Sequence, residues 1–297
     1  MCIVEFFQNC NHFSKNFTRY LGRYIKKGFT DSRNFTHAAA IMIPLVAIGP
    51  ANALELKTSY TMSVGSFSIG QANLTTRILP REYHIKAGLN LVGLAELFAN
   101  MKAATAVNGE IINEQIYPAH FFSKAQSGKD ERTVRMTMVK GNVGSVSVIP
   151  PLMLRNHDIP LEKHHKRSVL DPLSALLMPV SASRDMLAPE NCNRSIPVFD
   201  GGARMNILLK YKETRDAHKG YKGKVLVCSV QYTSIAGYQP SEKATNYLQK
   251  NKNMTVWLAP VDKTHFLMPV RANVETPAGS VVFEATRWKV TTDIASR

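Results

Sequence analysis

An alternation of apolar and polar residues, with a period of two, constrains the fold of this chain more than any other feature. Residues 54–64 (LELKTSYTMSV), 82–93 (EYHIKAGLNLVG) and 280–291 (SVVFEATRWKVT) show it most clearly. Turns rich in Gly, Pro, Asn and Asp separate such segments. Successive side chains of a β-strand point to opposite faces of a sheet, so the pattern is typical of strands with one buried face. We therefore predict an all-β fold.

The number of strands predicts the architecture. We count about eleven strands and one or two short helices over residues 54–297. No change in composition divides this part of the chain, so we expect a single β-rich domain. Antiparallel strands in such a number need covered or closed edges. A single antiparallel, strongly curved sheet or an open barrel meets this need, and it is the predicted arrangement.

Two segments depart from simple alternation. Residues 94–107 fit the spacing of a helix, but residues 102–112 (KAATAVNGEII) also fit two strands joined by an Asn-Gly turn, and both interpretations stay open. Asp171 is a good N-cap and Pro172 suits the first helical position. We therefore expect a helix of about two turns that ends at Pro179. This helix either packs on the sheet or forms a lid over a ligand cavity.

The first 53 residues have the features of a secretory signal peptide. Basic residues precede a short apolar run at residues 38–49, and residues 51–53 form a small-x-small cleavage site before Leu54. The run is about half the length of the roughly 20 residues that a membrane span needs. An uncleaved N-terminal anchor is the alternative. We expect an exported protein with no membrane span after cleavage.

Export decides how the four cysteines are interpreted. Cys2 and Cys10 lie in the leader and are lost with it, so Cys192 and Cys228 remain. An isolated pair of cysteines in an oxidising compartment is most simply a disulfide. Free thiols are an alternative, and metal or redox chemistry is a weaker one, because neither a C-x-x-C motif nor two further ligands are near.

The chain is strongly basic, with a formal net charge of +15. Removal of the leader leaves a net charge of about +11. An exported basic protein meets anionic lipid head groups, lipopolysaccharide and acidic cell-wall polymers. Nucleic acid fits less well as a partner, because export separates the two and the charges are scattered. Simple solubility in an anionic envelope is the alternative to specific binding.

Catalytic and cofactor-binding signatures are not apparent in the sequence. Ser174 does not lie in G-x-S-x-G, and residues 65–71 (GSFSIGQ) lack the Lys-Ser/Thr of a phosphate loop. The loop that carries His157, His164 and His165 has no acidic partner at fixed spacing, so a solvated basic loop is favoured over a metal site. We therefore expect a protein that is not an enzyme and holds no cofactor.

One motif resembles a known family. The run DPLSALLMPV, followed by CNRSIPVFDGGARMNI, resembles an uncharacterised family of exported Gram-negative envelope proteins, domain of unknown function 3108. Asn193, Ser195 and Gly202 depart from the family's pattern, which has Asp, Thr and Arg there. The positions that match, or that anchor the motif, are Asp171, Pro172, Arg194, Pro197, Asp200, Gly201 and Arg204.

The resemblance implies an exported all-β protein of the periplasm, similar in outline to open-barrel lipoprotein carriers, but it brings no established activity. Arg194 and Arg204 flank a tight turn, and we expect them to pair with Asp200 and Asp171. This structural role is favoured over a binding role. Three functions follow as hypotheses. The first is an envelope protein that holds a lipid or lipidated ligand in its curved sheet and supports envelope integrity. The second is a basic module for cell-wall polymer or lipopolysaccharide, and the third, weaker one is an envelope hydrolase.

Overall fold

The computed structural model describes residues 53–92, 101–153, 158–276 and 279–293 of the 297-residue chain. The predicted leader lies outside these residues, apart from Ala53, and so does His157. Most of the described chain belongs to one antiparallel sheet of 14 strands. The all-β prediction is therefore confirmed, but the expected number of about eleven strands was too low.

The strands, in chain order, are β1 Ala53–Val64, β2 Phe67–Ile78, β3 Glu82–Leu91, β4 Met101–Ile112, β5 Gln115–Ser127, β6 Asp130–Val139, β7 Asn142–Ile149, β8 Met178–Pro179, β9 Arg194–Phe199, β10 Arg204–Ala217, β11 Gly223–Ala236, β12 Met254–Pro260, β13 Phe266–Thr276 and β14 Gly279–Asp293. Helical elements in the described residues are the short 3-10 turns η1 Lys163–Lys166, η2 Ser174–Leu176 and η3 Pro189–Asn191, and the α-helix α3 Lys243–Lys250.

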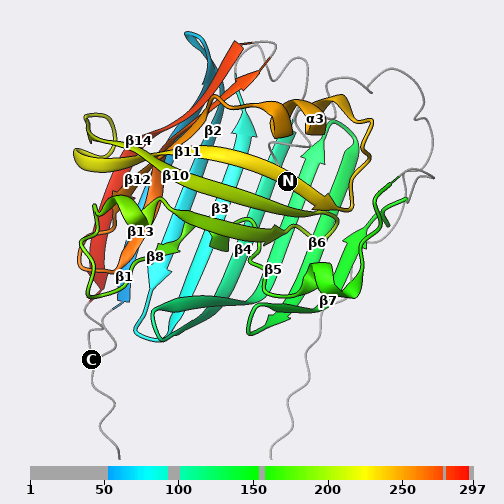
Figure 1. The fold of residues 1–297 in the computed structure, drawn as a ribbon, viewed down its shortest axis with the longest axis horizontal. Coiled ribbons are helices and arrows are strands. Elements are labelled where there is room, and N and C mark those ends of the chain that lie inside the picture. The colour runs from blue at the N-terminus through cyan, green and yellow to red at the C-terminus, as the bar shows by residue number, and fades with distance from the viewer. Residues whose placement is uncertain (1–52, 93–100, 154–157, 277–278, 294–297) are drawn as a thin grey trace, which may run out of the picture.

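The sheet is strongly curved and not closed. Its strand order is β7-β6-β5-β4-β3-β2-β1-β14-β13-β12-β11-β10-β9, with β8 paired to β13 at one side. Pairing of β1 with β14 joins the N-terminal and C-terminal halves, and β7 and β9 are left as the two edges. The sheet curves so far that β10 and β11 cross in front of β3–β6 (Figure 1).

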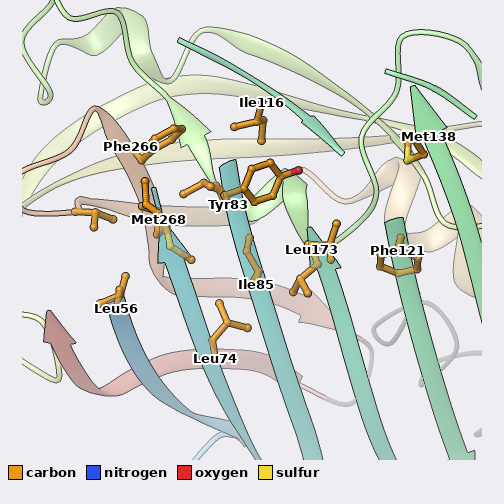
Figure 2. Packing of buried hydrophobic residues seen from close by; sticks show 14 of the residues in the cluster. Leu56, Leu74, Tyr83, Ile85, Ile116, Phe121, Met138, Leu173, Phe266 and Met268 are labelled. Atoms are coloured by element: carbon orange, nitrogen blue, oxygen red, sulfur yellow. The ribbon is translucent and has the colours of Figure 1, made fainter. Parts of the chain in front are cut away.

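The alternation in the sequence decides which face of each strand is buried. In β1 the side chains of Leu54 and Leu56 are buried, and in β3 those of Tyr83 and Ile85 are buried. They belong to one core cluster, together with residues of β5, β6 and β13. Figure 2 shows Leu56, Leu74 and Ile85 projecting from the neighbouring strands β1, β2 and β3 toward a common interior. The polar residues between them consequently form the outer face of the sheet.

Residues 158–193, here named the crossing segment, connect the two edges of the sheet through its interior. The N–H of Val169 donates to the carbonyl of Gly141 at 2.8 Å, and Leu170 pairs in parallel with Val198 of β9. Leu173 and Leu177 are buried in the same core cluster as the strands. Figure 2 shows Leu173 among these side chains. The crossing segment thus fills the concave side of the sheet with apolar side chains.

The predicted two-turn helix from Asp171 to Pro179 was wrong. Only the 3-10 turn η2 forms there, and the chain then extends so that Met178 pairs with Leu267 of β13. Asp171 and Pro172 do begin a helical turn, as their residue types indicate, but the backbone of β13 supplies hydrogen bonds that replace those of a second turn.

The predicted Asn-Gly turn in residues 102–112 was also wrong. β4 runs through Asn108 and Gly109 with only a shift in register, and the turn lies at Asn113 and Glu114, whose φ angles are 50° and 61°. Gly109 has a different role, because a Cβ there would lie 2.7 Å from the ring and hydroxyl of Tyr83. The strand interpretation of this part of the segment is confirmed, and residues 94–100 lie outside the described residues.

Candidate functional site

The predicted disulfide is present. Cys192, at the end of η3, and Cys228, in β11, are joined with an S–S distance of 2.07 Å and a Cα–Cα distance of 5.6 Å. Both residues are fully buried within the second core cluster. The bond closes a loop of 36 residues and spans β10, which lies between β9 and β11 in the sheet. It therefore ties the crossing segment to the C-terminal strands.

The Asp171–Pro172 motif forms a buried polar connection in the core. The Oδ1 of Asp171 accepts the N–H groups of Leu173 and Ser174 at 2.9 and 3.0 Å, which is the geometry of a helix N-cap. The Ser174 hydroxyl in turn lies 2.7 Å from the hydroxyl of Tyr83 in β3. Burial raises the pKa of the Asp171 carboxyl. Burial likewise raises the pKa of Tyr83, and the charge of Asp171 adds to this effect.

Asp200 and Gly201 build the tight turn between β9 and β10. The Oδ1 of Asp200 accepts the N–H of Gly202 at 2.9 Å and that of Ala203 at 2.7 Å. Gly201 has a φ of 101°, and a Cβ there would lie 2.5 Å from a methyl group of Val134. Only glycine fits this position, because both the backbone conformation and the contact with β6 exclude a side chain.

The ion pairs expected for Arg194 and Arg204 are not formed, so this prediction was wrong. The guanidinium of Arg194 donates to two carbonyl oxygens, of Asn191 at 2.8 Å and of Pro179 at 3.0 Å. The guanidinium of Arg204 donates to Asn206 at 2.7 Å and to the carbonyl of Met205. The Oδ1 atoms of Asp171 and Asp200 accept backbone N–H groups of their own turns, and each arginine instead donates to carbonyl or amide oxygens.

Pro197 lies in the edge strand β9, where a missing N–H costs no ladder bond. Its carbonyl accepts the N–H of Leu170 at 2.8 Å. The motif residues therefore gather around β9 and the crossing segment, and their contacts are those of a structural cluster.

The basic loop takes up a short 3-10 turn. The Nδ1 of His165 accepts the N–H of Glu162 at 3.0 Å, and His164 lies 3.2 Å from the carboxylate of the same residue. Among the described residues, three or more His, Cys, Asp or Glu side chains do not gather anywhere in a geometry suited to a metal ion. Within the same residues, helices are too short or too polar to cross a membrane.

A hollow on the outer face of the sheet was not foreseen from the sequence. It has a volume of about 520 Å³ and crosses strands β3 to β7. Pairing of the strands places Lys86, Ala106, Phe122, Arg135 and Ser147 side by side in one row. An adjacent row that also lines the hollow consists of His84, Asn108, His120, Thr137 and Ser145. We name this feature the outer-face hollow.

The outer-face hollow combines positive charge with an apolar floor. Its described lining includes Lys86 and Arg135, both exposed, but includes no carboxylate. The guanidinium carbon of Arg135 lies 5.2 Å from the ring centroid of Phe122, a cation–π contact that orients the charge. Glu82 lies 3.6 Å from His84 but does not line the hollow. Because Ala106 is small, the space between Lys86 and Phe122 remains open.

Strand alternation predicts that Lys86 and Arg135 point outward, but it does not decide between the adjacent Phe121 and Phe122. It also does not predict which residues of different strands are neighbours. The register across five strands decides that, and a shift by one residue in any strand would turn its polar set inward. No signal in a single sequence specifies this register. The residues of the outer-face hollow were therefore missed as a group.

A protein-family model matches most of the chain. The model of the DUF3108 family, described as a protein of unknown function, matches residues 59–286. The chain belongs to the DUF3108 family. The match covers all the strands except the ends of β1 and β14, and it includes both the crossing segment and the outer-face hollow.

No curated protein matches this DUF3108 chain. Among solved structures, it is similar to a beta-barrel-like protein of domain of unknown function DUF1849 from Brucella abortus, with a TM-score of 0.41 and 7% identity. That similarity covers 82% of this chain and 100% of the other.

Proposed function

We propose that this DUF3108 protein is a non-enzymatic binding protein of the periplasm, which holds glycans bearing phosphate or carboxylate groups in the outer-face hollow. One observation carries the proposal. Lys86 and Arg135 lie on either side of Phe122 in one hollow, and the described residues that line it include no carboxylate. Lipopolysaccharide and acidic cell-wall polymers are the two sources of such groups in an envelope.

The chemistry of the hollow suits a charged sugar. Arg135 and Lys86 offer N–H donors to an anionic oxygen, and such charge-assisted hydrogen bonds are the stronger kind. The ring of Phe122 offers an apolar face on which a sugar ring packs. The hydroxyls of Ser145 and Ser147 supply further polar contacts at the opposite side. Binding therefore depends on both charge and shape.

The charge of the whole chain supports the same function. Without the predicted leader the chain has a net charge of about +11, which attracts polyanions over distances longer than a single contact. The disulfide between Cys192 and Cys228 is compatible with an oxidising compartment. The leader predicted over residues 1–53 supports a periplasmic location.

A lipid inside the curved sheet, the first hypothesis from the sequence, has less support. The crossing segment takes up the concave side, where Val169, Leu173 and Leu177 are buried against the strands. These side chains occupy the space that a lid would have to leave for an acyl chain. We therefore favour the outer face.

Binding of purified, full-length protein to immobilised lipopolysaccharide and to isolated peptidoglycan tests the proposal. Affinity should fall steeply between about 50 and about 500 mM NaCl, because salt screens exposed charges. The double substitution Lys86→Gln/Arg135→Gln should weaken binding about tenfold or more. The glycan that responds to both changes identifies the source of the ligand.

The matched control is Lys224→Gln/Arg167→Gln. It removes the same number of positive charges from exposed positions outside the hollow. It should leave the affinity close to that of the unchanged protein. Equal losses in the two double variants would show that net charge, and not the outer-face hollow, is responsible, and the proposal would then be rejected.

A further inference from the structure

The edge strand β9 is covered along only part of its length. On the side away from β10, Leu170 donates its N–H to the Pro197 carbonyl at 2.8 Å and accepts the Phe199 N–H at 2.9 Å. Backbone groups of alternate residues in a strand point to the same side. The N–H and C=O of Ser195, which is exposed, consequently also point away from β10. The edge thus offers one donor and one acceptor to a further strand.

A second hollow, of about 530 Å³, lies beside this part of β9. We name it the edge hollow. Ser195 and Pro197 line one side of it, and residues 115–117 at the start of β5 line another, together with Lys140 and Gly141. Elements from both halves of the sheet therefore surround the uncovered edge and leave room for a short extended chain.

Positively charged side chains outnumber carboxylates in the edge hollow. Arg184 and Arg194 both line it, and Glu190 is the one carboxylate among the described residues that do so. The hydrogen bonds of Arg194 go to carbonyl oxygens. Burial lowers the pKa of Arg194, and the positive charge of Arg184 lowers it further. Two guanidinium groups that repel each other favour an anion between them.

We propose that the edge hollow binds the carboxy-terminal end of an extended peptide from a partner protein. The peptide adds a short strand to β9 through the N–H and C=O of Ser195, and its terminal carboxylate contacts Arg184 and Arg194. Main-chain pairing supplies affinity with little dependence on sequence. The planar guanidinium groups supply selectivity, because they match the two oxygens of a carboxylate.

The length of the uncovered edge explains why the end of a chain fits. Leu170 occupies the edge from Pro197 onward, and η3 precedes the strand at its other end. A strand that passes through would collide with one of them. The positive charge then selects a carboxylate over an ammonium terminus. This site shares no lining residue with the outer-face hollow, so the two proposals succeed or fail independently.

Two fluorescent octapeptides, labelled at the amino terminus, test the inference with the full-length protein. Both have the sequence Thr-Val-Ser-Val-Thr-Val-Ser-Val, one with a free terminal carboxylate and one with a terminal amide. Fluorescence anisotropy should show saturable binding of the free acid, and amidation should weaken binding about tenfold. Arg184→Gln should cause a loss of similar size for the free acid. Arg184 is exposed, so this variant should fold normally.

Arg81→Gln, at an exposed arginine outside the edge hollow, is the matched control and should bind like the unchanged protein. Hydrogen exchange followed by NMR adds a readout of the backbone contact, because bound free acid should slow exchange of the Ser195 amide. The inference would be overturned if the acid and the amide bound equally well, or if Arg184→Gln had no effect. It would also be overturned if the Ser195 amide were not protected, or if saturable binding were absent below about 1 mM.

Discussion

The hydroxyl of Tyr83 lies 2.7 Å from the Oγ of Ser174, and this hydrogen bond connects β3 to the crossing segment within the core. Both residues are 0% exposed. The bond joins positions that are 91 residues apart, so it forms only when the crossing segment has entered the concave side of the sheet. It stabilises the arrangement that distinguishes this fold from an empty curved sheet.

Tyr83→Phe or Ser174→Ala should each lower the free energy of unfolding by about 1–3 kcal/mol, because each leaves one buried hydroxyl without its partner. The double variant should cost less than the sum of the two single variants, since it leaves neither hydroxyl behind. Urea unfolding of the four proteins measures this coupling. Strictly additive effects would show that the hydrogen bond contributes nothing.

Asp171→Asn should alter how stability depends on pH. Burial raises the pKa of Asp171 above 3.8, so the folded state binds this proton more tightly than the unfolded state does. The resulting stabilisation is complete below the unfolded pKa and is lost as pH rises through the folded pKa. Asparagine keeps an oxygen for the N–H groups of Leu173 and Ser174 but does not ionise. The free energy of unfolding of the Asp171→Asn variant should therefore decline less between about pH 4 and pH 8 than that of the unchanged protein.

Urea unfolding at several pH values compares the two proteins, and the difference between their curves isolates the contribution of Asp171. A constant difference across this range would contradict the expected role of its carboxyl. Asp171→Ala should be less stable at every pH, because it removes the acceptor at the N-cap and leaves two buried N–H groups without a partner.

Replacement of both Cys192 and Cys228 by alanine should lower the free energy of unfolding by about 3–4 kcal/mol, as expected for a closed loop of 36 residues. Alanine avoids the burial of new hydroxyl groups at two fully buried positions. The urea midpoint under oxidising conditions measures the effect. Addition of a reductant should lower the midpoint of the unchanged protein but not that of the variant, and equal responses would contradict the prediction.

Gly109→Ala should destabilise the protein by about 1–3 kcal/mol, because the new methyl group would overlap both the Tyr117 carbonyl oxygen, 2.4 Å away, and the ring of Tyr83. Gly88→Ala, in the neighbouring strand β3, is a suitable control. A Cβ there would meet only the Ala103 carbonyl at 4.0 Å, so its effect should be small. Thermal unfolding of the two variants gives a direct comparison, and similar melting temperatures would argue against a steric role of Gly109.

The fold class and the disulfide were predictable because they follow from local patterns. Alternation in residues 54–64 and 82–93 indicates strands whatever they pair with, and the two cysteines that lie outside the predicted leader have only each other. The helix expected at Asp171 failed for the opposite reason. Its residue types favour a helical start. However, Met178 pairs with Leu267 of β13, which lies 89 residues further along the chain. A single sequence carries no information about such pairing.

The outer-face hollow likewise combines features that the sequence predicts with features that it does not predict. The sequence by itself determined that Lys86 and Arg135 belong to the polar face of their strands, because apolar residues alternate with them. Only the tertiary structure decided that they lie in one row, that Ala106 leaves a hollow between them, and that Leu170 covers half of β9. The physical reason is that alternation is a property of one strand, whereas register and edge contacts depend on interactions between segments that are far apart in the sequence.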